Sequence, residues 1–173
     1  MRTLVIGGAA SGKSEYAENL ATQCAKPWYY VATLIPCDDE SCTRIARHKQ
    51  IRFKKGFSTV EQYTGLSGLG LNKRGTALLE CLGNLVANEM YSPDGSKEAC
   101  RDEILDGIST LEKQCRNLIV VTNDVFSDGC DYGNGSLLYL ETLGQLNRCL
   151  AQRFERVVEV VCGIPVVLKG GSL

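Results

Sequence analysis

The apolar residues of the chain fall into short continuous runs that are separated by longer stretches with helical spacing. A strand buried on both faces reads as such a run, whereas an amphipathic helix repeats its apolar positions every three or four residues. Strand-like runs, many of them rich in β-branched residues, occupy residues 3–6, 28–33, 77–82, 118–122, 156–161 and 166–169. Helical patterns occupy residues 15–21, 39–52, 97–115 and 137–154.

Strands that alternate with helices predict an α/β fold with a mostly parallel sheet and helices on both faces. Only Gly163-Ile164-Pro165 separates the last two strands, which is too short for a crossover helix, so a C-terminal antiparallel hairpin is expected. The glycine-rich stretch 65–75 is expected to form a surface loop. Because no segment has the composition of a linker, we expect residues 1–173 to form a single domain.

The composition is ordinary for a globular protein, with 44% hydrophobic and 23% charged residues. The formal net charge of −1 gives no global basic field, so no nucleic-acid partner is expected. No apolar run approaches the length of a membrane span, and the N-terminus shows no signal-peptide pattern. We therefore expect an untargeted, cytoplasmic protein.

Nine scattered cysteines include no C-x-x-C pair. Without such a pair, zinc-ligand spacing is absent from the sequence. Several of the cysteines lie in apolar runs, as Cys81 and Cys162 do. We expect them to be reduced and packed as small hydrophobic residues, and a catalytic cysteine has little support.

The most specific motif follows the first predicted strand directly. The pattern G-x-x-x-x-G-K-[ST] is matched at every constrained position by Gly7, Gly8, Ala9, Ala10, Ser11, Gly12, Lys13 and Ser14. In this motif the glycines turn backbone N–H groups inward around phosphate oxygens, and the following helix adds its partial positive charge. An ordinary glycine turn is the alternative, but the strand–loop–helix context favours a phosphate loop (P-loop) of the NTPase type. Lys13 is then expected on the β- and γ-phosphates, and Ser14 on Mg²⁺.

In a parallel sheet of this kind, ligands bind at the carboxyl ends of the strands. That rule selects the loop after Ile6, the segment after Thr33, the region of Glu80 and the segment after Thr122. The carboxylate of Glu80 suits an Mg²⁺ or hydroxyl contact, although a capping or ion-paired role is an alternative. Asn123 and Asp124, which follow Thr122, either form a turn or position substrate or metal.

His48 is the only histidine in the chain. In a helix, Arg44, His48 and Arg52 would share one face at positions i, i+4 and i+8. Flanking cations disfavour protonation of the imidazole, which leaves a neutral nucleophile between two guanidinium groups suited to phosphate. The residues alone leave a second interpretation open, in which this is a solvated basic helix face with an incidental histidine.

The chain resembles the bifunctional adenosylcobinamide kinase / adenosylcobinamide-phosphate guanylyltransferase family of cobalamin biosynthesis nearly from end to end. The resemblance is carried by the phosphate loop and by the segments 30–33, 38–40 leading to 44–52, 78–82 and 121–125, followed by Gly144 and Asn147. The segment from Tyr30 to Arg52 is more specific than the phosphate loop, which many NTPases share.

The resemblance implies that the chain phosphorylates adenosylcobinamide with ATP or GTP and transfers GMP from GTP to adenosylcobinamide phosphate through His48. It implies Mg²⁺, a nucleoside triphosphate, a corrinoid substrate and a homo-oligomer, a trimer by analogy with the family. His48, Lys13 and Glu80 would be catalytic, and Ser14 and Glu80 would hold the metal. Nucleotide contacts beyond the phosphate loop would come from Thr33, Arg44, Arg52, Glu61 and Glu80.

The chain departs from the family pattern at several positions. Ala10, Leu137 and Leu140 stand where the family has arginines, and Phe53 stands where it has a proline. Positive charge around the γ-phosphate matters for phosphoryl transfer. Two alternatives therefore remain open at this stage: a diverged P-loop small-molecule kinase, and a nucleotide-binding regulator lacking one or both activities.

Overall fold

The computed structural model describes residues 1–36, 46, 49–50, 52–125 and 134–171. Seven strands form one sheet in the order β3-β2-β4-β5-β1-β6-β7. The strands are β1 (Arg2–Gly7), β2 (Trp28–Ala32), β3 (Phe57–Glu61), β4 (Thr76–Glu80), β5 (Asn117–Asn123), β6 (Arg156–Val161) and β7 (Ile164–Lys169). All neighbouring strands run parallel except β6 and β7, which pair antiparallel. The predicted α/β fold with a C-terminal hairpin is confirmed.

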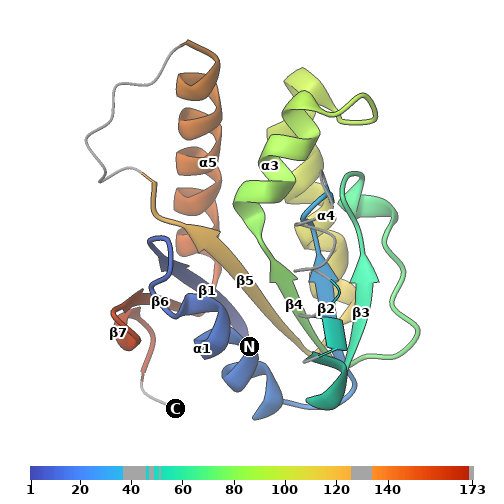
Figure 1. Cartoon of the computed structure of the whole chain (residues 1–173), viewed down its shortest axis with the longest axis vertical. Coiled ribbons are helices and arrows are strands. Elements are labelled where there is room, and N and C mark those ends of the chain that lie inside the picture. The colour runs from blue at the N-terminus through green and yellow to red at the C-terminus, as the bar shows by residue number, and fades with distance from the viewer. Residues whose placement is uncertain (37–45, 47–48, 51, 126–133, 172–173) are drawn as a thin grey trace.

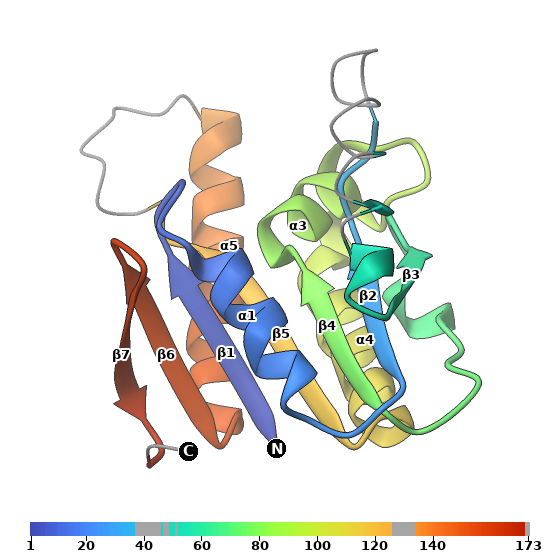
Figure 2. The same cartoon turned by 60° about the horizontal axis from the view of Figure 1, so that its bottom comes forward.

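Helices cover both faces of the sheet, as the sequence predicts (Figures 1 and 2). The helices are α1 (Lys13–Thr22), α3 (Leu82–Tyr91), α4 (Cys100–Gln114) and α5 (Asn134–Arg153), with short 3₁₀ turns η1 (Leu66–Gly68) and η2 (Lys97–Ala99). Helix α1 packs on one face, in a core with Val5, Leu78 and Val158. Helices α3, α4 and α5 pack on the other face, in a larger core that includes Leu4 and Leu79. Within the described residues, no helix is long and apolar enough to span a membrane.

Two elements were not predicted from the sequence. Strand β3 is short and only Phe57 in it is fully buried, so its hydrophobic pattern is weak. Helix α3 is not evident from the sequence, because Leu82 continues the apolar run of β4. That run predicts a strand that extends to residue 82. The strand in fact ends at Glu80, and Leu82, Leu85 and Val86 are the buried face of a helix. Most of the predicted helix 39–52 lies outside the described residues, although residues 46, 49–50 and 52–54 are helical.

The C-terminal hairpin turns one residue earlier than the sequence suggests. The turn residues are Cys162 and Gly163, with φ angles of 51° and 79°, and Ile164 and Pro165 already belong to β7. Two successive positive φ angles are typical of the tight hairpin turns that match strand twist. The expectation that Cys162 is packed as a small hydrophobic residue is wrong, because it is exposed at this turn. Cys81, Cys100 and Cys115 are buried as free thiols, as expected.

Candidate nucleotide-binding site

The carboxyl ends of the parallel strands bring the predicted site segments to one edge of the sheet. Ile6 pairs with Thr122, and Gly7 with Asn123, in the register of β1 and β5. Across β2, Ala32 is in register with both Glu61 of β3 and Glu80 of β4. Asp124 donates its backbone N–H to the carbonyl of Gly7 at 3.0 Å, which ties the end of β5 to the start of the phosphate loop. The four segments selected from the sequence are therefore neighbours.

The phosphate loop has the backbone shape that its glycines predict. Gly12 has a φ of 88°, in the left-handed region, directly before α1 begins at Lys13. A Cβ atom on Gly7 would lie 2.7 Å from the carbonyl oxygen of Val160, so β6 leaves no room for a side chain there. Gly163 of the hairpin turn donates its N–H to the carbonyl of Ser11 at 2.8 Å. The hairpin formed by β6 and β7 thus packs against the phosphate loop and holds its backbone, a role that the sequence pattern does not predict.

Lys13 is held against the loop that it follows. Its side chain is buried, with 9% exposed, and its Nζ donates to the carbonyl of Gly8 at 3.0 Å. The ammonium group therefore lies inside the curve of the loop, where the motif predicts the phosphate-binding lysine.

Ser14 and Glu80 meet at this edge. The Ser14 hydroxyl donates to Oε1 of Glu80 at 2.6 Å, although the two residues are distant in sequence. The Glu80 carboxylate also takes a hydrogen bond from the Tyr30 hydroxyl, and its second oxygen, Oε2, is buried. A hydroxyl and a carboxylate side by side fit the few protein ligands with which Mg²⁺ is bound beside phosphate oxygens. Among the described residues there is no cluster of three or more His, Cys, Asp or Glu side chains that could hold a metal by itself.

The environment of Glu80 makes its carboxyl group a stronger base than an exposed one. Burial raises the pKa of Glu80, while the hydrogen bond from Ser14 and the positive charge of Arg52 act in the opposite direction. Burial also raises the pKa of the neighbouring Tyr30 hydroxyl, and the charge of Glu80 adds to that shift. The interpretation of Glu80 as a helix-capping residue is not what the structure shows, since its partner is the serine of the phosphate loop.

Tyr30 is a site residue that sequence reasoning did not single out. In the register of β2 and β4, Tyr30 pairs with Leu78, so it shares a face of the sheet with Glu80 at a diagonal position. The guanidinium carbon of Arg52 lies 3.7 Å above the centre of the Tyr30 ring. The period of two along both strands was the signal that could have placed Tyr30 beside Glu80.

Arg52 is not part of a solvated helix face. Its side chain is only 6% exposed and stacks on Tyr30, in the same cluster as Glu80. Neighbouring Lys55 pairs with Glu18 of α1 at 2.5 Å, which fastens this segment to the helix of the phosphate loop. The other two members of the predicted stripe, Arg44 and His48, lie outside the described residues.

Thr33 and Glu61 both lie at the predicted edge of the sheet, but Thr33 is buried and bonded to the backbone, whereas Glu61 forms an ion pair near the surface. Thr33 is fully buried, and its hydroxyl both donates to the Cys81 carbonyl at 2.9 Å and accepts the Cys81 N–H at 2.7 Å. These bonds make Thr33 a support for the backbone next to Glu80, and a direct nucleotide contact stays a prediction. Glu61 lies at the outer end of the edge and forms a 2.9 Å ion pair with Lys49.

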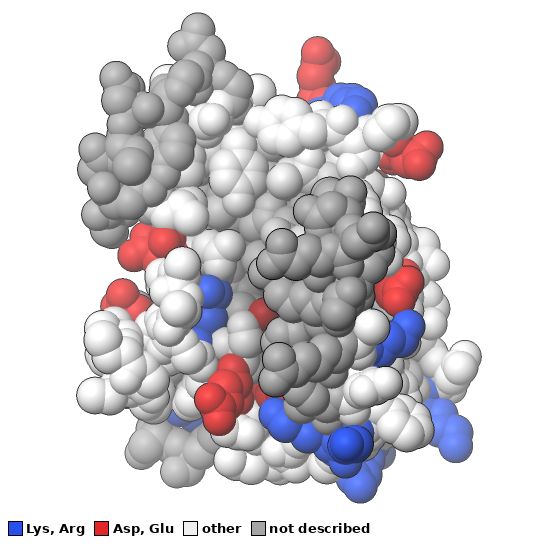
Figure 3. Space-filling model, in the orientation of Figure 1, with Lys and Arg blue, Asp and Glu red and all other residues white. Residues whose placement is uncertain are grey.

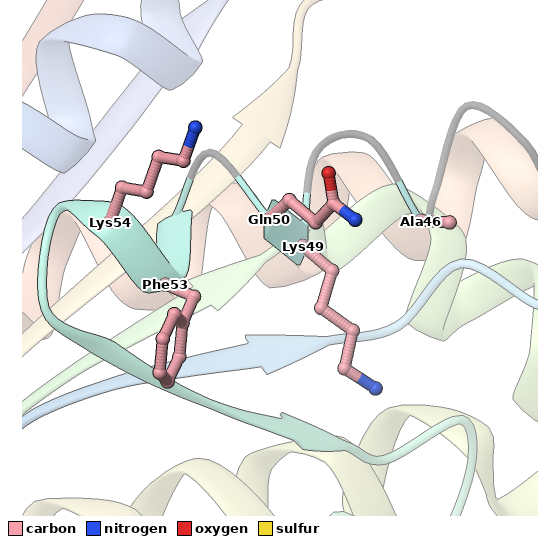
Figure 4. Close-up of a pocket in the computed structure, with 5 residues that line it drawn as sticks. All are labelled: Ala46, Lys49, Gln50, Phe53 and Lys54. Atoms are coloured by element: carbon pink, nitrogen blue, oxygen red, sulfur yellow. The ribbon is translucent and has the colours of Figure 1, made fainter.

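Two of the pockets formed by the described residues bear on this site. One, of about 420 Å³, is lined by Ala46, Lys49, Gln50, Phe53 and Lys54. Figure 4 shows the Phe53 ring and the Lys49 chain on the same side of the helical segment, with Lys54 pointing away. Phe53 is 77% exposed. The other pocket, of about 650 Å³, lies between the end of β1 and residues 137–148 of α5.

Cys81 gives no support to a catalytic thiol at this edge. It is buried, its sulfur accepts the Asn84 N–H at the start of α3, and burial raises its pKa. Asn123 donates to the same sulfur at 3.8 Å. A thiol that stays protonated is a poor nucleophile, so the reactive groups at the edge are those of the phosphate loop and Glu80.

A phosphate loop at the carboxyl edge of a parallel sheet, with a buried lysine and a serine–carboxylate pair, defines a P-loop nucleotide-binding protein. The crystal structure of flagellar accessory protein FlaH from Methanocaldococcus jannaschii shares the fold, with a TM-score of 0.50 at 11% identity, over 98% of this chain and 78% of that chain. At that identity the likeness shows the fold alone.

Sequence comparison identifies the family. The sequence model of the family described as cobinamide kinase / cobinamide phosphate guanyltransferase matches residues 3–168. Similar proteins include the bifunctional adenosylcobalamin biosynthesis protein CobP of Pseudomonas aeruginosa, 32% identical over the whole of both chains. CobU of Escherichia coli K12, which bears the same description, is 31% identical over 98% of this chain and 100% of its own length.

The chain belongs to the cobinamide kinase / cobinamide phosphate guanyltransferase family. It is accordingly a transferase that uses nucleotide and corrinoid substrates in adenosylcobalamin biosynthesis. The two alternatives left open by the sequence, a diverged kinase and a regulator, are not favoured by this match.

Proposed function

We propose that one domain carries both reactions, with the phosphate loop phosphorylating adenosylcobinamide from ATP or GTP and His48 carrying GMP to adenosylcobinamide phosphate. The observation that supports the kinase site most directly is the 2.6 Å hydrogen bond between Glu80 and Ser14, the residue that follows Lys13 in the chain. It brings a metal-binding hydroxyl and a buried carboxylate to the mouth of the phosphate loop.

Each residue of the kinase site has a separate task. Ser14 and Glu80 would hold Mg²⁺, which neutralises phosphate charge when it is bound. Lys13 would leave the Gly8 carbonyl and bind the β- and γ-phosphates. The Ser14 hydroxyl occupies only Oε1 of Glu80, so the carboxylate keeps an oxygen, Oε2, that suits a substrate hydroxyl or the metal. Arg52 adds positive charge to the same cluster, which matters because Ala10 leaves the loop itself with Lys13 alone.

Guanylyl transfer is proposed to proceed in two steps at His48. The neutral imidazole attacks the α-phosphorus of GTP, so a P–N bond forms, the bond to pyrophosphate breaks and the ring N–H proton leaves to solvent. A phosphate oxygen of adenosylcobinamide phosphate then attacks the same phosphorus, the P–N bond breaks, and the imidazole takes up a proton. Arg44 and Arg52 are proposed to bind the phosphate oxygens during both steps.

The test is incubation with GTP and Mg²⁺, followed by intact mass measurement. The expected result is a mass gain of one GMP that survives base and is lost in acid, as a phosphoramidate should be. Adding adenosylcobinamide phosphate should remove the adduct and yield adenosylcobinamide-GDP. A protein that phosphorylates adenosylcobinamide but never gains GMP would be a kinase only.

Glu80→Gln is expected to lower the kinase rate by about 10²- to 10⁴-fold without destabilising the fold. The amide keeps the size of the side chain and the oxygen that accepts the Ser14 hydroxyl, but it cannot carry charge. Because burial raises the pKa of Glu80, the folded protein binds this proton more tightly than the unfolded chain, so ionisation costs stability as pH rises through the raised pKa. The thermal midpoint of the variant should therefore equal that of wild type in acid and exceed it at neutral and alkaline pH.

Thermal midpoints at several pH values, without nucleotide or Mg²⁺, and Mg²⁺-dependent initial rates check both parts. Glu112→Gln is the matched control, because Glu112 is a carboxylate that pairs with Arg2 at the opposite end of the sheet. A large fall in the midpoint of Glu80→Gln, with an unchanged rate per folded molecule, would make Glu80 a structural residue.

We propose that the protein is a homo-oligomer, a trimer by analogy with the family. Strand β7 at the sheet edge supports self-association, since Ile164, Val166, Val167 and Leu168 are between 40% and 65% exposed. An exposed apolar edge strand is a surface that proteins normally cover. Light scattering of the purified protein measures the mass directly.

A further inference from the structure

Among the described residues that line the pocket between β1 and α5, none belongs to the phosphate loop. Its apolar wall comes from Ile6 at the end of β1 and from Leu137 and Leu140 on α5, and the charged residues Glu141 and Arg148 of α5 also line it. Figure 1 shows the first half of α5 rising beyond the carboxyl ends of the strands, and Figure 3 shows charged side chains of both signs at the top and in the lower part of this face. At about 650 Å³ the pocket has the size of a small-molecule site.

Asn147 on the wall of this pocket carries an unpaired donor. Its side chain is 8% exposed, and its Oδ1 accepts a 2.8 Å bond from the fully buried hydroxyl of Thr122. Its Nδ2 is buried and has no partner among the residues that the structure describes. Buried polar groups in folded proteins are nearly always paired, so this amide group fits a ligand that brings an acceptor oxygen.

Ile6 links the pocket to the phosphate loop. It immediately precedes Gly7 in the chain, and in the sheet it is the register partner of Thr122, whose hydroxyl bonds to Asn147. Ile6 shares its face of the sheet with Leu4, whose side chain packs in the core beneath α5. A ligand in the pocket would therefore lie against α5 while one of its ends reaches the phosphate loop.

We propose that this pocket binds the corrinoid acceptor, a proposal that rests on the proposed kinase function. A corrinoid is an apolar macrocycle with amide side chains around its edge. Leu137, Leu140 and Ile6 contact the macrocycle, and Nδ2 of Asn147 donates a hydrogen bond to the oxygen of one amide. The pocket is smaller than a whole corrinoid, so it holds one edge of the ring, with the aminopropanol arm directed to the phosphate loop. The apolar side chains of Leu137 and Leu140 suit the macrocycle rather than phosphate.

The test compares two neighbouring leucines of similar exposure. Leu137 lines the pocket and is 51% exposed, whereas Leu138 is 57% exposed and lines a different pocket, beside Met90 and Thr142. Leu137→Gln and Leu138→Gln remove the same apolar side chain, add no charge and keep helix propensity. Cobinamide binding is measured by its absorbance change, and KM for cobinamide by the kinase rate.

Leu137→Gln should weaken cobinamide binding about tenfold, in line with the loss of one partly buried leucine contact, and Leu138→Gln should leave it unchanged. Leu140→Gln, at a half-buried position in the same pocket, should weaken it at least as much. In all three variants the affinity for GTP, the rate of GMP-adduct formation and the mass by light scattering should match wild type.

Asn147→Asp keeps the oxygen that accepts the Thr122 hydroxyl but removes the donor. It should raise KM for cobinamide without changing KM for the nucleotide, and its thermal midpoint shows whether it folds. If wild type is active and neither Leu137→Gln nor Leu140→Gln changes the affinity for cobinamide, the pocket assignment is overturned and the proposed function is not. Weaker GTP binding would assign the pocket to the nucleobase, and a lower mass would assign it to a second copy. Wild-type protein that binds no cobinamide overturns the proposed function together with this inference.

Discussion

Lys13→Ala is expected to weaken triphosphate binding by at least about a hundredfold and to abolish the kinase reaction. The Lys13 ammonium is buried against the Gly8 carbonyl, inside the curve of the phosphate loop. Residues 7–14 contain no Lys or Arg besides Lys13, so no other cation within the loop can replace the lost charge. Calorimetry with ATP and GTP measures the affinity, and phosphorylation of adenosylcobinamide measures the rate.

Two further variants make the result specific. Lys13→Arg should also fail, because a planar guanidinium does not fit a pocket shaped for a compact ammonium. Lys113→Ala removes an equal charge from the last turn of α4 and should bind nucleotide as wild type does. Tight nucleotide binding by Lys13→Ala would contradict the assignment of the phosphate loop.

His48→Asn is expected to reduce guanylyl transfer by a factor on the order of 10⁴ or more, while nucleotide binding and the kinase step remain. Asparagine cannot supply the nitrogen nucleophile that a covalent GMP intermediate requires. Binding comes mainly from the phosphate loop, Lys13 and the Ser14–Glu80 pair, which the substitution leaves in place. The loss should therefore appear in the rate and not in the affinity.

Intact mass after incubation with GTP and Mg²⁺, together with separate assays of the two half-reactions, measures this effect. Gln50→Asn is a suitable control, since residue 50 is an exposed helical position in the same segment. Formation of adenosylcobinamide-GDP at the wild-type rate by His48→Asn would show that another group is the nucleophile. If wild type transfers GMP but does not phosphorylate adenosylcobinamide, the loss of the kinase reaction would be attributed to the apolar residues Leu137 and Leu140, at positions where the sequence departs from the expected pattern.

Much of the site could be read from the sequence because its chemistry is local. A phosphate loop is built from consecutive residues, so Gly7 to Ser14 predict its shape without knowledge of the rest of the fold. The rule that ligands bind at the carboxyl edge of a parallel sheet added Glu80 and the segments after Thr33 and Thr122. The structure places all of these at one edge. Arg44 and His48 lie outside the described residues, so their roles remain predictions.

The errors of sequence reading have local causes as well. Leu82 follows the apolar run of β4 without a break, so periodicity alone could not show that the strand ends at Glu80 and that α3 begins. Strand β3 has a weak apolar pattern because it lies at the sheet edge. Cys162 follows the apolar residues of β6, a pattern that predicts burial, but it lies in the tight turn of the hairpin and is exposed.

The sequence by itself determined the alternation of strands and helices, the phosphate loop and the family, because each depends on residue type and spacing along the chain. Only the tertiary structure decided which distant side chains meet. The packing of α1 against β4 joins Ser14 to Glu80, and the stacking of Arg52 on Tyr30 buries an arginine that spacing alone could have left in solvent. The bond from Thr122 fixes Asn147 beside the pocket between β1 and α5 and leaves its Nδ2 buried without a partner among the described residues. These contacts arise from sheet order and packing between elements distant in the chain, which no local pattern specifies.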